Sequence, residues 1–93
     1  MIQTFADSRC EQFFRHGRTP ARWRSFSKAA TRKLDMLDGA VKLDDLRSPP
    51  GNRLEALKGD RAGQFSIRIN DQWRVCFRWT DSGPADVAII DYH

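Results

Sequence analysis

The chain has 93 residues, of which 40% are hydrophobic and 11% aromatic, so we expect one globular domain, residues 1–93, and exclude disorder. Sixteen Lys and Arg residues against twelve Asp and Glu give a formal net charge of +4, which favours polyanionic or acidic partners. Residues 1–7 lack the features of a signal peptide, and no apolar run approaches the roughly 18 residues of a membrane helix. These features predict a soluble cytoplasmic protein that does not bind membranes.

Helical patterns dominate the first half of the chain. Ser8 and Glu11 have the spacing of a capping box, and Gly17 offers a C-terminal stop, so we predict a first helix between them. Pro20 then starts a second, longer amphipathic helix that extends to about Gly39. Its apolar face is predicted to comprise Trp23, Phe26, Ala30, Leu34, Leu37 and Val41.

The other face of this second helix is basic. It reads either as a solvated helix surface or as a contact for RNA or a partner protein, and the pattern alone leaves both open. The positive side chains on this face are Arg22, Arg24, Lys28, Arg32 and Lys33.

Strand patterns fill the second half, after a loop at residues 47–52 in which consecutive prolines remove backbone donors. Alternating apolar and polar residues, bounded by Gly, Asp and Asn, predict a small sheet. Strands are expected at residues 2–5, 53–57, 64–70, 73–79 and 85–91.

The register of the central hairpin follows from its alternation. A three-residue loop at residues 70–72 pairs Ile67 with Val75 and keeps the apolar side chains on one face. It also places Arg68 opposite Arg74. Two like charges facing each other destabilise a strand pair by about 0.2–1 kcal/mol unless an anion lies between them. The alternative is that each guanidinium turns to water or to a carboxylate.

The two cysteines, Cys10 and Cys76, fall in different predicted elements, with no CxxC motif and no His cluster nearby. We therefore expect both to be reduced, and Cys76 to be a half-buried strand residue rather than a nucleophile. His16 is expected at the end of the first helix, where the helix dipole favours a cation.

The sequence closes on Asp91, Tyr92 and His93, directly after the last predicted strand. Cleavage of RNA needs a base for the 2′-OH, an acid for the departing 5′ oxygen and cations for the phosphorane charge. His93, with an unperturbed pKa of roughly 6.5, suits the acid or the base. Asp91 suits a base or an orienting partner for His93, and Tyr92 suits stacking on a nucleobase or carrying a proton. Each also has a plain reading, as an exposed or packed strand-end residue.

Positive charge is concentrated around the predicted turn and hairpin, at Lys58, Arg61, Arg68 and Arg74. Arginine binds two phosphate oxygens at once with its planar fork. Glu55, just before the turn, suits a general base among these cations or one half of a surface ion pair. The chain has no P-loop, no GxGxxG, no HExxH and no acidic cluster suited to magnesium, so we expect metal-free chemistry and no cofactor.

Four stretches together resemble the HigB toxins of the RelE/ParE toxin–antitoxin superfamily. These stretches are LRSPPGNRLE at residues 46–55, LEALKGDRAG at residues 54–63, SIRINDQWRVCF at residues 66–77 and the final Asp-Tyr-His. The first of them is similar to the GraT-like branch, within the plasmid maintenance system killer family. The resemblance spans nearly the whole chain.

The resemblance implies an α+β, RelE-like microbial RNase fold, with two N-terminal helices packed on a small antiparallel sheet. It implies an endoribonuclease, an mRNA interferase, that inhibits translation by cutting mRNA in the ribosomal A site. Its partners would be the ribosome and a HigA-like helix-turn-helix antitoxin, with operator DNA reached only indirectly through that antitoxin. It implies catalytic roles for Asp91, Tyr92 and His93, and phosphate contacts for Lys58 and Arg74.

Glu55 departs from the family pattern, because some HigB toxins carry a catalytic His just before the Lys-Gly-Asp-Arg turn. A carboxylate serves as a base but repels phosphate, so we expect a weaker enzyme. In the expected mechanism Asp91 or Glu55 assists attack by the 2′-OH and His93 protonates the leaving oxygen. Two alternatives stay open: a ParE-like inhibitor of a topoisomerase, and an RNA- or ribosome-binding module without cleavage. Residues expected to hold RNA are Arg68, Arg61, Arg78, Lys28 and Arg32.

Overall fold

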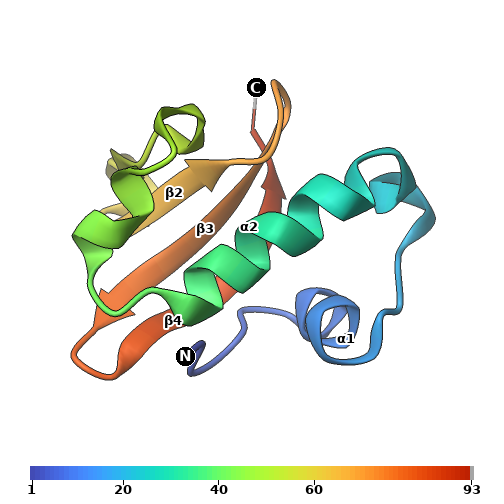
Figure 1. Ribbon diagram of the computed structural model, residues 1–93, viewed down its shortest axis with the longest axis horizontal. Coiled ribbons are helices and arrows are strands. Elements are labelled where there is room, and N and C mark those ends of the chain that lie inside the picture. Colours follow the sequence, from blue (N-terminus) through green and yellow to red (C-terminus); the bar gives the residue numbers. More distant parts are fainter. Residues whose placement is uncertain (93) are drawn as a thin grey trace.

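The computed structural model describes residues 1–92 of the chain, arranged as Figure 1 shows. The α-helices of this part are α1 (Ser8–His16) and α2 (Ser27–Gly39). Its strands are β1 (Glu55–Ala56), β2 (Gln64–Arg68), β3 (Trp73–Thr80) and β4 (Gly83–Asp91). Its 3-10 helices are η1 (Ala21–Phe26), η2 (Leu43–Arg47), η3 (Pro50–Asn52) and η4 (Gly59–Arg61).

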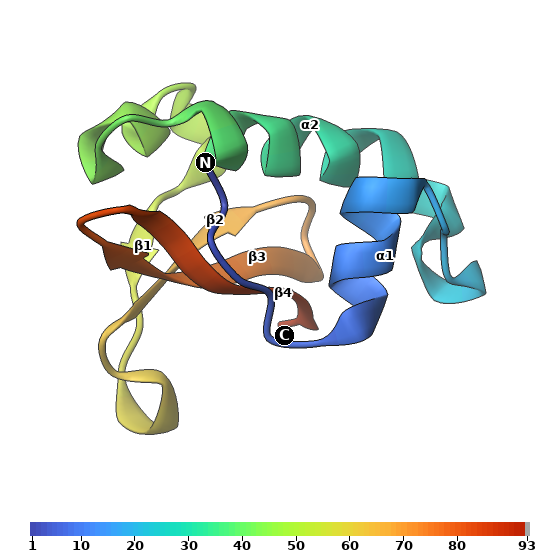
Figure 2. The same cartoon turned by 90° about the horizontal axis from the view of Figure 1, so that it is seen from below.

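The strands form one antiparallel sheet in the order β1-β2-β3-β4. Helix α2 runs across one face of this sheet and contacts β3 and β4 (Figure 2). Helix α1 packs near the N-terminal end of α2 and contacts β4. We call the sheet face covered by α2 the helix face, and the opposite one the far face. The expected α+β arrangement, two helices packed on a small antiparallel sheet, is confirmed.

The β2–β3 hairpin has the register that its alternation predicts. Ile67 pairs with Val75, and Arg68 pairs with Arg74. Asn70 stabilises the three-residue loop, because its side-chain oxygen accepts hydrogen bonds from the backbone amides of residues 72 and 73, both at 2.8 Å. Asn is favoured in such loops because its short side chain bonds the local backbone. The helix face of the hairpin therefore carries apolar side chains, and the far face carries the polar ones.

The core lies between α2 and the helix face of the sheet. Five of the six apolar residues predicted for the second helix are buried, but Val41 is 88% exposed and that prediction was wrong. The helix ends at Gly39, and Ala40 is already extended, so the 100° step per residue stops before Val41. The Val41 amide instead donates to Asp45 Oδ2 at 2.9 Å and turns the chain into η2.

Three predicted elements are shorter or differently wound than expected. The segment before α2 is a 3-10 helix, η1, whose three-residue turn aligns Trp23 with Phe26 so that both are buried. The expected first strand is reduced to a parallel bridge between Phe5 and Val87. The strand expected at residues 53–57 is reduced to β1, because Arg53 adopts a left-handed conformation (φ 46°) that interrupts the extended backbone.

Helix α1 is capped by Asp7 and not, as the capping-box pattern predicted, by Ser8. The Asp7 carboxylate accepts a hydrogen bond from the Cys10 amide at 2.9 Å. Glu11 does not complete the box, because its carboxylate pairs with Arg15 one turn later, at 3.2 Å. The predicted stop is confirmed, since Gly17 adopts the left-handed conformation (φ 68°).

Replacing Asp7 with alanine is expected to lower the free energy of unfolding by about 1 kcal/mol, since one amide of the first turn loses its acceptor. The matched variant Ser8→Ala keeps the cap and is expected to change stability by less than about 0.5 kcal/mol. Urea denaturation of both variants measures the difference. A larger loss from Ser8→Ala than from Asp7→Ala would contradict this assignment of the cap.

Cys10 and Cys76 are both unpaired thiols, as expected, but Cys76 is completely buried and not half-buried as predicted. Burial raises the pKa of the Cys10 thiol to about 12, and the nearby Asp7 carboxylate acts in the same direction. Burial also raises the pKa of Cys76. Neither thiol therefore has the lowered pKa of a reactive cysteine. Within residues 1–92, no helix is long and apolar enough to cross a membrane.

Candidate functional site

An open cleft on the molecule contains residues from both outer strands of the sheet. Glu55 comes from β1, Lys58 from the chain that follows β1, and Tyr92 from the chain that follows β4. Although β1 and β4 are at opposite edges of the sheet, the residues that line this cleft come from β1 and the chain after it and from the chain that follows β4. The cleft has a volume of about 430 Å³, and we call it the site cleft. Its lining residues are Glu55, Ala56, Leu57, Lys58 and Tyr92.

Arg74 projects from β3 beside this cleft, and its guanidinium is held in place. Its Nε donates to Ser66 Oγ at 2.7 Å, and its Nη2 donates to the Arg53 carbonyl oxygen at 2.6 Å. The centre of the guanidinium lies 6.0 Å from the centroid of the Tyr92 ring. These bonds use two of the five N–H donors of an arginine side chain. Arg74 is therefore a preset cation that retains donors for an anion next to Tyr92.

Arg61 strengthens the positive charge on this side of the sheet. Burial raises the pKa of Cys76, and the positive charges of Arg61 and Arg74 act against that rise. Both cations are thus close enough to act on the same buried thiol. Arg61 Nη1 also donates to Gln64 Oε1 at 3.3 Å, which holds the side chain against β2.

Arg68 does not share an anion-binding position with Arg74, although the two residues pair across the strands. The Arg68 guanidinium donates to Asp71 in the hairpin loop, whereas Arg74 bonds Ser66. Of the two readings of this pair, the structure matches the one in which the guanidinium groups diverge. Pairing Arg68 with a carboxylate also relieves the repulsion expected of facing charges.

Asp91 lies on the opposite side of the sheet from Arg74. It pairs with Trp73, one residue before Arg74, and successive strand residues point to opposite faces. Its carboxylate accepts from Gln72 Nε2 at 3.1 Å and lies 3.9 Å from Arg22 Nη2. Of the final three residues, the structure therefore brings Tyr92 into the site cleft and leaves Asp91 out. His93 lies outside the described residues.

The remaining predicted RNA contacts are distributed over the surface. Arg78 is four residues along β3 from Arg74, roughly 13 Å away, and its Nε donates to Asp86 at 2.6 Å. Lys28 and Arg32 lie on α2, on the other layer of the molecule. They line a separate hollow of about 560 Å³, together with Arg24, Ser25, Phe26, Ser27, Ala29 and Asn70.

The residues that position these groups were not predicted from the sequence. Ser66 and Arg53 hold Arg74, and Gln72 and Arg22 hold Asp91. For Ser66 the sequence did contain one indication, because the hairpin register places Ser66 on the same face of the sheet as Arg74. The Arg53 contact comes through a backbone carbonyl, which no side-chain pattern reveals.

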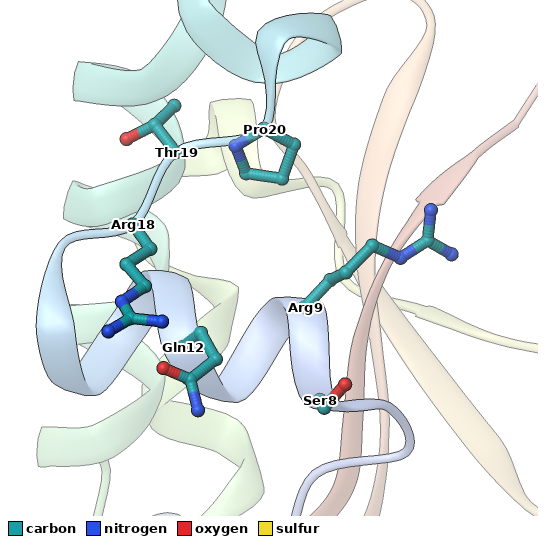
Figure 3. Close-up of a pocket in the computed structure, with 6 residues that line it drawn as sticks. All are labelled: Ser8, Arg9, Gln12, Arg18, Thr19 and Pro20. Atoms are coloured by element: carbon teal, nitrogen blue, oxygen red, sulfur yellow. The ribbon is translucent and has the colours of Figure 1, made fainter.

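Another hollow, of about 300 Å³, lies between α1 and the chain leading to η1 (Figure 3). Figure 3 shows the Arg9 side chain directed away from those of Gln12 and Arg18, so the two cations do not converge on one ligand position. Among the predicted site residues that the structure describes, none lines this hollow. In the described part of the chain, no group of three or more His, Cys, Asp or Glu residues is placed to hold a metal ion.

Comparison with known proteins gives one consistent family. Residues 3–93 match the HigB-like toxins, described as the RelE-like toxin of the type II toxin–antitoxin system HigB. Toxin HigB-1 of Vibrio cholerae serotype O1 is 43% identical over an alignment 97 residues long. The alignment covers 100% of this chain and 98% of that protein. Endoribonuclease HigB of Proteus vulgaris is 31% identical over 61 residues, covering 66% of this chain and 65% of that protein.

A solved structure shares the fold. The chain superimposes on the YoeB-YefM complex from Staphylococcus aureus with a TM-score of 0.63 and 22% identity, over 100% of this chain and 95% of that one. At this identity the likeness establishes the fold alone, and it agrees with the RelE-like fold implied by the sequence. The family match and the full-length relative carry the assignment: the chain belongs to the HigB-like family of type II toxin–antitoxin toxins.

Proposed function

We propose that this toxin is an endoribonuclease that cuts mRNA at the site cleft. The observation that carries the proposal is the Arg74 guanidinium, preset by two hydrogen bonds beside the exposed ring of Tyr92. A preorganised cation of this kind stabilises charge that develops in a transition state, at no cost of reorganisation. The name of the Proteus vulgaris relative, Endoribonuclease HigB, supports the same chemistry.

In the proposed reaction the RNA 2′-oxygen attacks the adjacent phosphorus, and the bond from phosphorus to the 5′ oxygen breaks. A base takes the 2′-OH proton, and an acid gives a proton to the departing 5′ oxygen. Glu55 lines the cleft and is the base in this scheme, with His93 as the acid. Arg74 and Lys58 neutralise the phosphorane, and Tyr92 stacks on a nucleobase. The products are a 2′,3′-cyclic phosphate and a 5′-OH.

Glu55 limits the rate in this scheme. An exposed carboxylate next to a phosphate repels it, whereas an imidazole at the same place would not. Two cations near the cleft, Lys58 and Arg74, offset that repulsion only in part. We therefore propose a slower enzyme than the HigB toxins that carry a histidine at this position.

The substrate is proposed to be mRNA held in the ribosomal A site. The site cleft is small and offers few groups to orient an RNA strand, so a larger assembly must supply much of the geometry. The basic hollow of Lys28 and Arg32 lies on the other layer, which suits a polyanion that extends around the molecule. Arg61, whose charge acts on the same buried thiol as that of Arg74, would contact the RNA strand. A HigA-like antitoxin is the proposed protein partner, in keeping with the toxin–antitoxin family.

Primer extension on an mRNA translated in a purified system tests the proposal. Added toxin is expected to produce new 5′ ends inside codons. An Arg74→Ala toxin is expected to leave the transcript nearly intact. Intact mRNA together with inhibited DNA supercoiling would replace the nuclease with a topoisomerase inhibitor. Intact mRNA with ribosome binding retained would leave a binding module without cleavage.

A further inference from the structure

Gln72, the last residue of the β2–β3 hairpin loop, contacts the chain at the end of β4 in two places. Its side-chain Nε2 donates to Asp91 Oδ2 at 3.1 Å. Its backbone carbonyl accepts from the Tyr92 amide at 2.6 Å. One loop residue thus fixes both the side chain of Asp91 and the backbone of Tyr92.

Arg22 of η1 adds a third contact at the same point. Its guanidinium lies 5.4 Å from the centroid of the Trp73 ring and 3.9 Å from Asp91 Oδ2. Trp73 in turn packs on Phe26, with ring centroids 5.0 Å apart, and is buried in the core. The carboxylate of Asp91 is therefore connected to the hairpin loop and, through Arg22, to the helix face.

These contacts determine where Tyr92 lies. Asp91 is fixed on the helix-face side, and successive residues of an extended chain point to opposite sides, so Tyr92 is directed to the far face. There its ring lies beside Arg74 and lines the site cleft. Tyr92 follows the last residue of β4, and its backbone is held by the hydrogen bond from its amide to the Gln72 carbonyl.

We propose that Asp91 is a positioning residue that acts through Tyr92, and that Gln72 and Arg22 are its anchors. The catalytic part of this inference rests on the proposed function, whereas the anchoring part does not. A carboxylate that receives a hydrogen bond from Gln72 on the helix-face side is poorly placed to take a proton from a 2′-OH bound beside Arg74. Its contribution is the orientation of the ring that stacks on the substrate.

Two substitutions at one position separate positioning from proton transfer. Asp91→Asn retains an oxygen that accepts from Gln72 but cannot act as a general base. It is expected to lower the single-turnover rate of mRNA cleavage by no more than about three-fold, whereas Asp91→Ala lowers it by about ten-fold or more. Gln72→Ala is expected to behave like Asp91→Ala. The double variant is expected to be no slower than Asp91→Ala alone, because the two side chains serve one contact.

Hydrogen exchange of the Tyr92 amide, followed by NMR, tests the anchoring without reference to catalysis. This amide is expected to exchange about ten-fold faster in Asp91→Ala and Gln72→Ala than in the native protein and in Asp91→Asn, with the amides of β2 and β3 unchanged. Arg22→Ala is expected to accelerate it by a smaller factor. Arg15→Ala is the matched control, since Arg15 also combines a carboxylate contact (Glu11, 3.2 Å) with an aromatic one (Phe5, 5.4 Å).

The outcomes are distinct. An Asp91→Asn toxin as inactive as Asp91→Ala, with unchanged exchange at Tyr92 in both, would overturn the proposal and make Asp91 the base. Equal exchange at Tyr92 in native, Asp91→Ala and Gln72→Ala proteins would overturn the anchoring on its own. If the native protein cuts no mRNA, the proposed function fails, and the exchange rates still decide whether Asp91 and Gln72 hold Tyr92.

Discussion

Arg74→Ala is expected to lower the single-turnover rate of mRNA cleavage by about 10²–10³-fold, the cost of losing one preorganised donor at a charged transition state. Arg74 is the cation that both Ser66 and the Arg53 carbonyl orient toward Tyr92. Arg74→Lys keeps the charge but loses the planar fork, so its cleavage rate is expected to lie between those of the native toxin and Arg74→Ala. The rate is measured on ribosomes programmed with a defined mRNA.

Two further variants make this result interpretable. Ser66→Ala removes the acceptor of the Arg74 Nε and leaves the charge. It is expected to lower the cleavage rate by about ten-fold, a smaller decrease than that of Arg74→Ala. Arg47→Ala is the matched control, because Arg47 is exposed and pairs with Asp44 in its own 3-10 helix, at 2.9 Å. Thermal unfolding of each variant verifies the fold. A rate for Arg74→Ala within about three-fold of the Arg47→Ala rate would contradict the central role of this guanidinium.

Phe77→Ala is expected to lower the free energy of unfolding by about 3–5 kcal/mol, the usual cost of removing a fully buried aromatic ring. Phe77 is completely buried on β3, the strand that pairs with both β2 and β4, and its ring packs 6.3 Å from that of Phe65. A domain of this size is typically stable by only about 5–15 kcal/mol, so the loss is a large fraction of the total.

Val41→Ala is the matched control for this stability test. Val41 is also an apolar residue, but it is 88% exposed, so its removal is expected to change stability by less than about 0.5 kcal/mol. Urea denaturation of the two variants compares them under the same conditions. Equal losses from Phe77→Ala and Val41→Ala would contradict the core described here and restore the sequence-based assignment of Val41.

The sequence predicted the central hairpin of the sheet better than the cap of α1 or the extent of the apolar face of α2. The β2–β3 register followed from strict alternation, because slipping by one residue would move Ile67 and Val75 out of the core. The cap of α1 was misassigned because Asp7 and Ser8 are both good capping residues and only the backbone conformation decides between them. The apolar face of α2 was extended too far for a similar reason, since nothing in the apolar spacing marks Ala40 as extended.

The structure brings together only some of the site residues that the sequence suggested, and their catalytic roles stay a prediction. Glu55, Lys58 and Tyr92 come together at the site cleft, with Arg74 beside Tyr92. Asp91 does not, and the reason is elementary: neighbouring residues of a strand face opposite ways, so Asp91 and Tyr92 cannot both join Arg74. Adjacent residues with suitable chemistry were read as one group, although the period of the strand separates them.

Cleavage of an mRNA that carries a single 2′-deoxynucleotide 5′ to the scissile phosphate is the most direct test of the site cleft as an RNA-cleaving centre. Without a 2′-OH there is no internal nucleophile, so the native toxin is expected to leave that position intact. It is expected to cut the matched all-ribose mRNA to a 2′,3′-cyclic phosphate end. Cutting of the 2′-deoxy substrate at the same position and rate would contradict the mechanism.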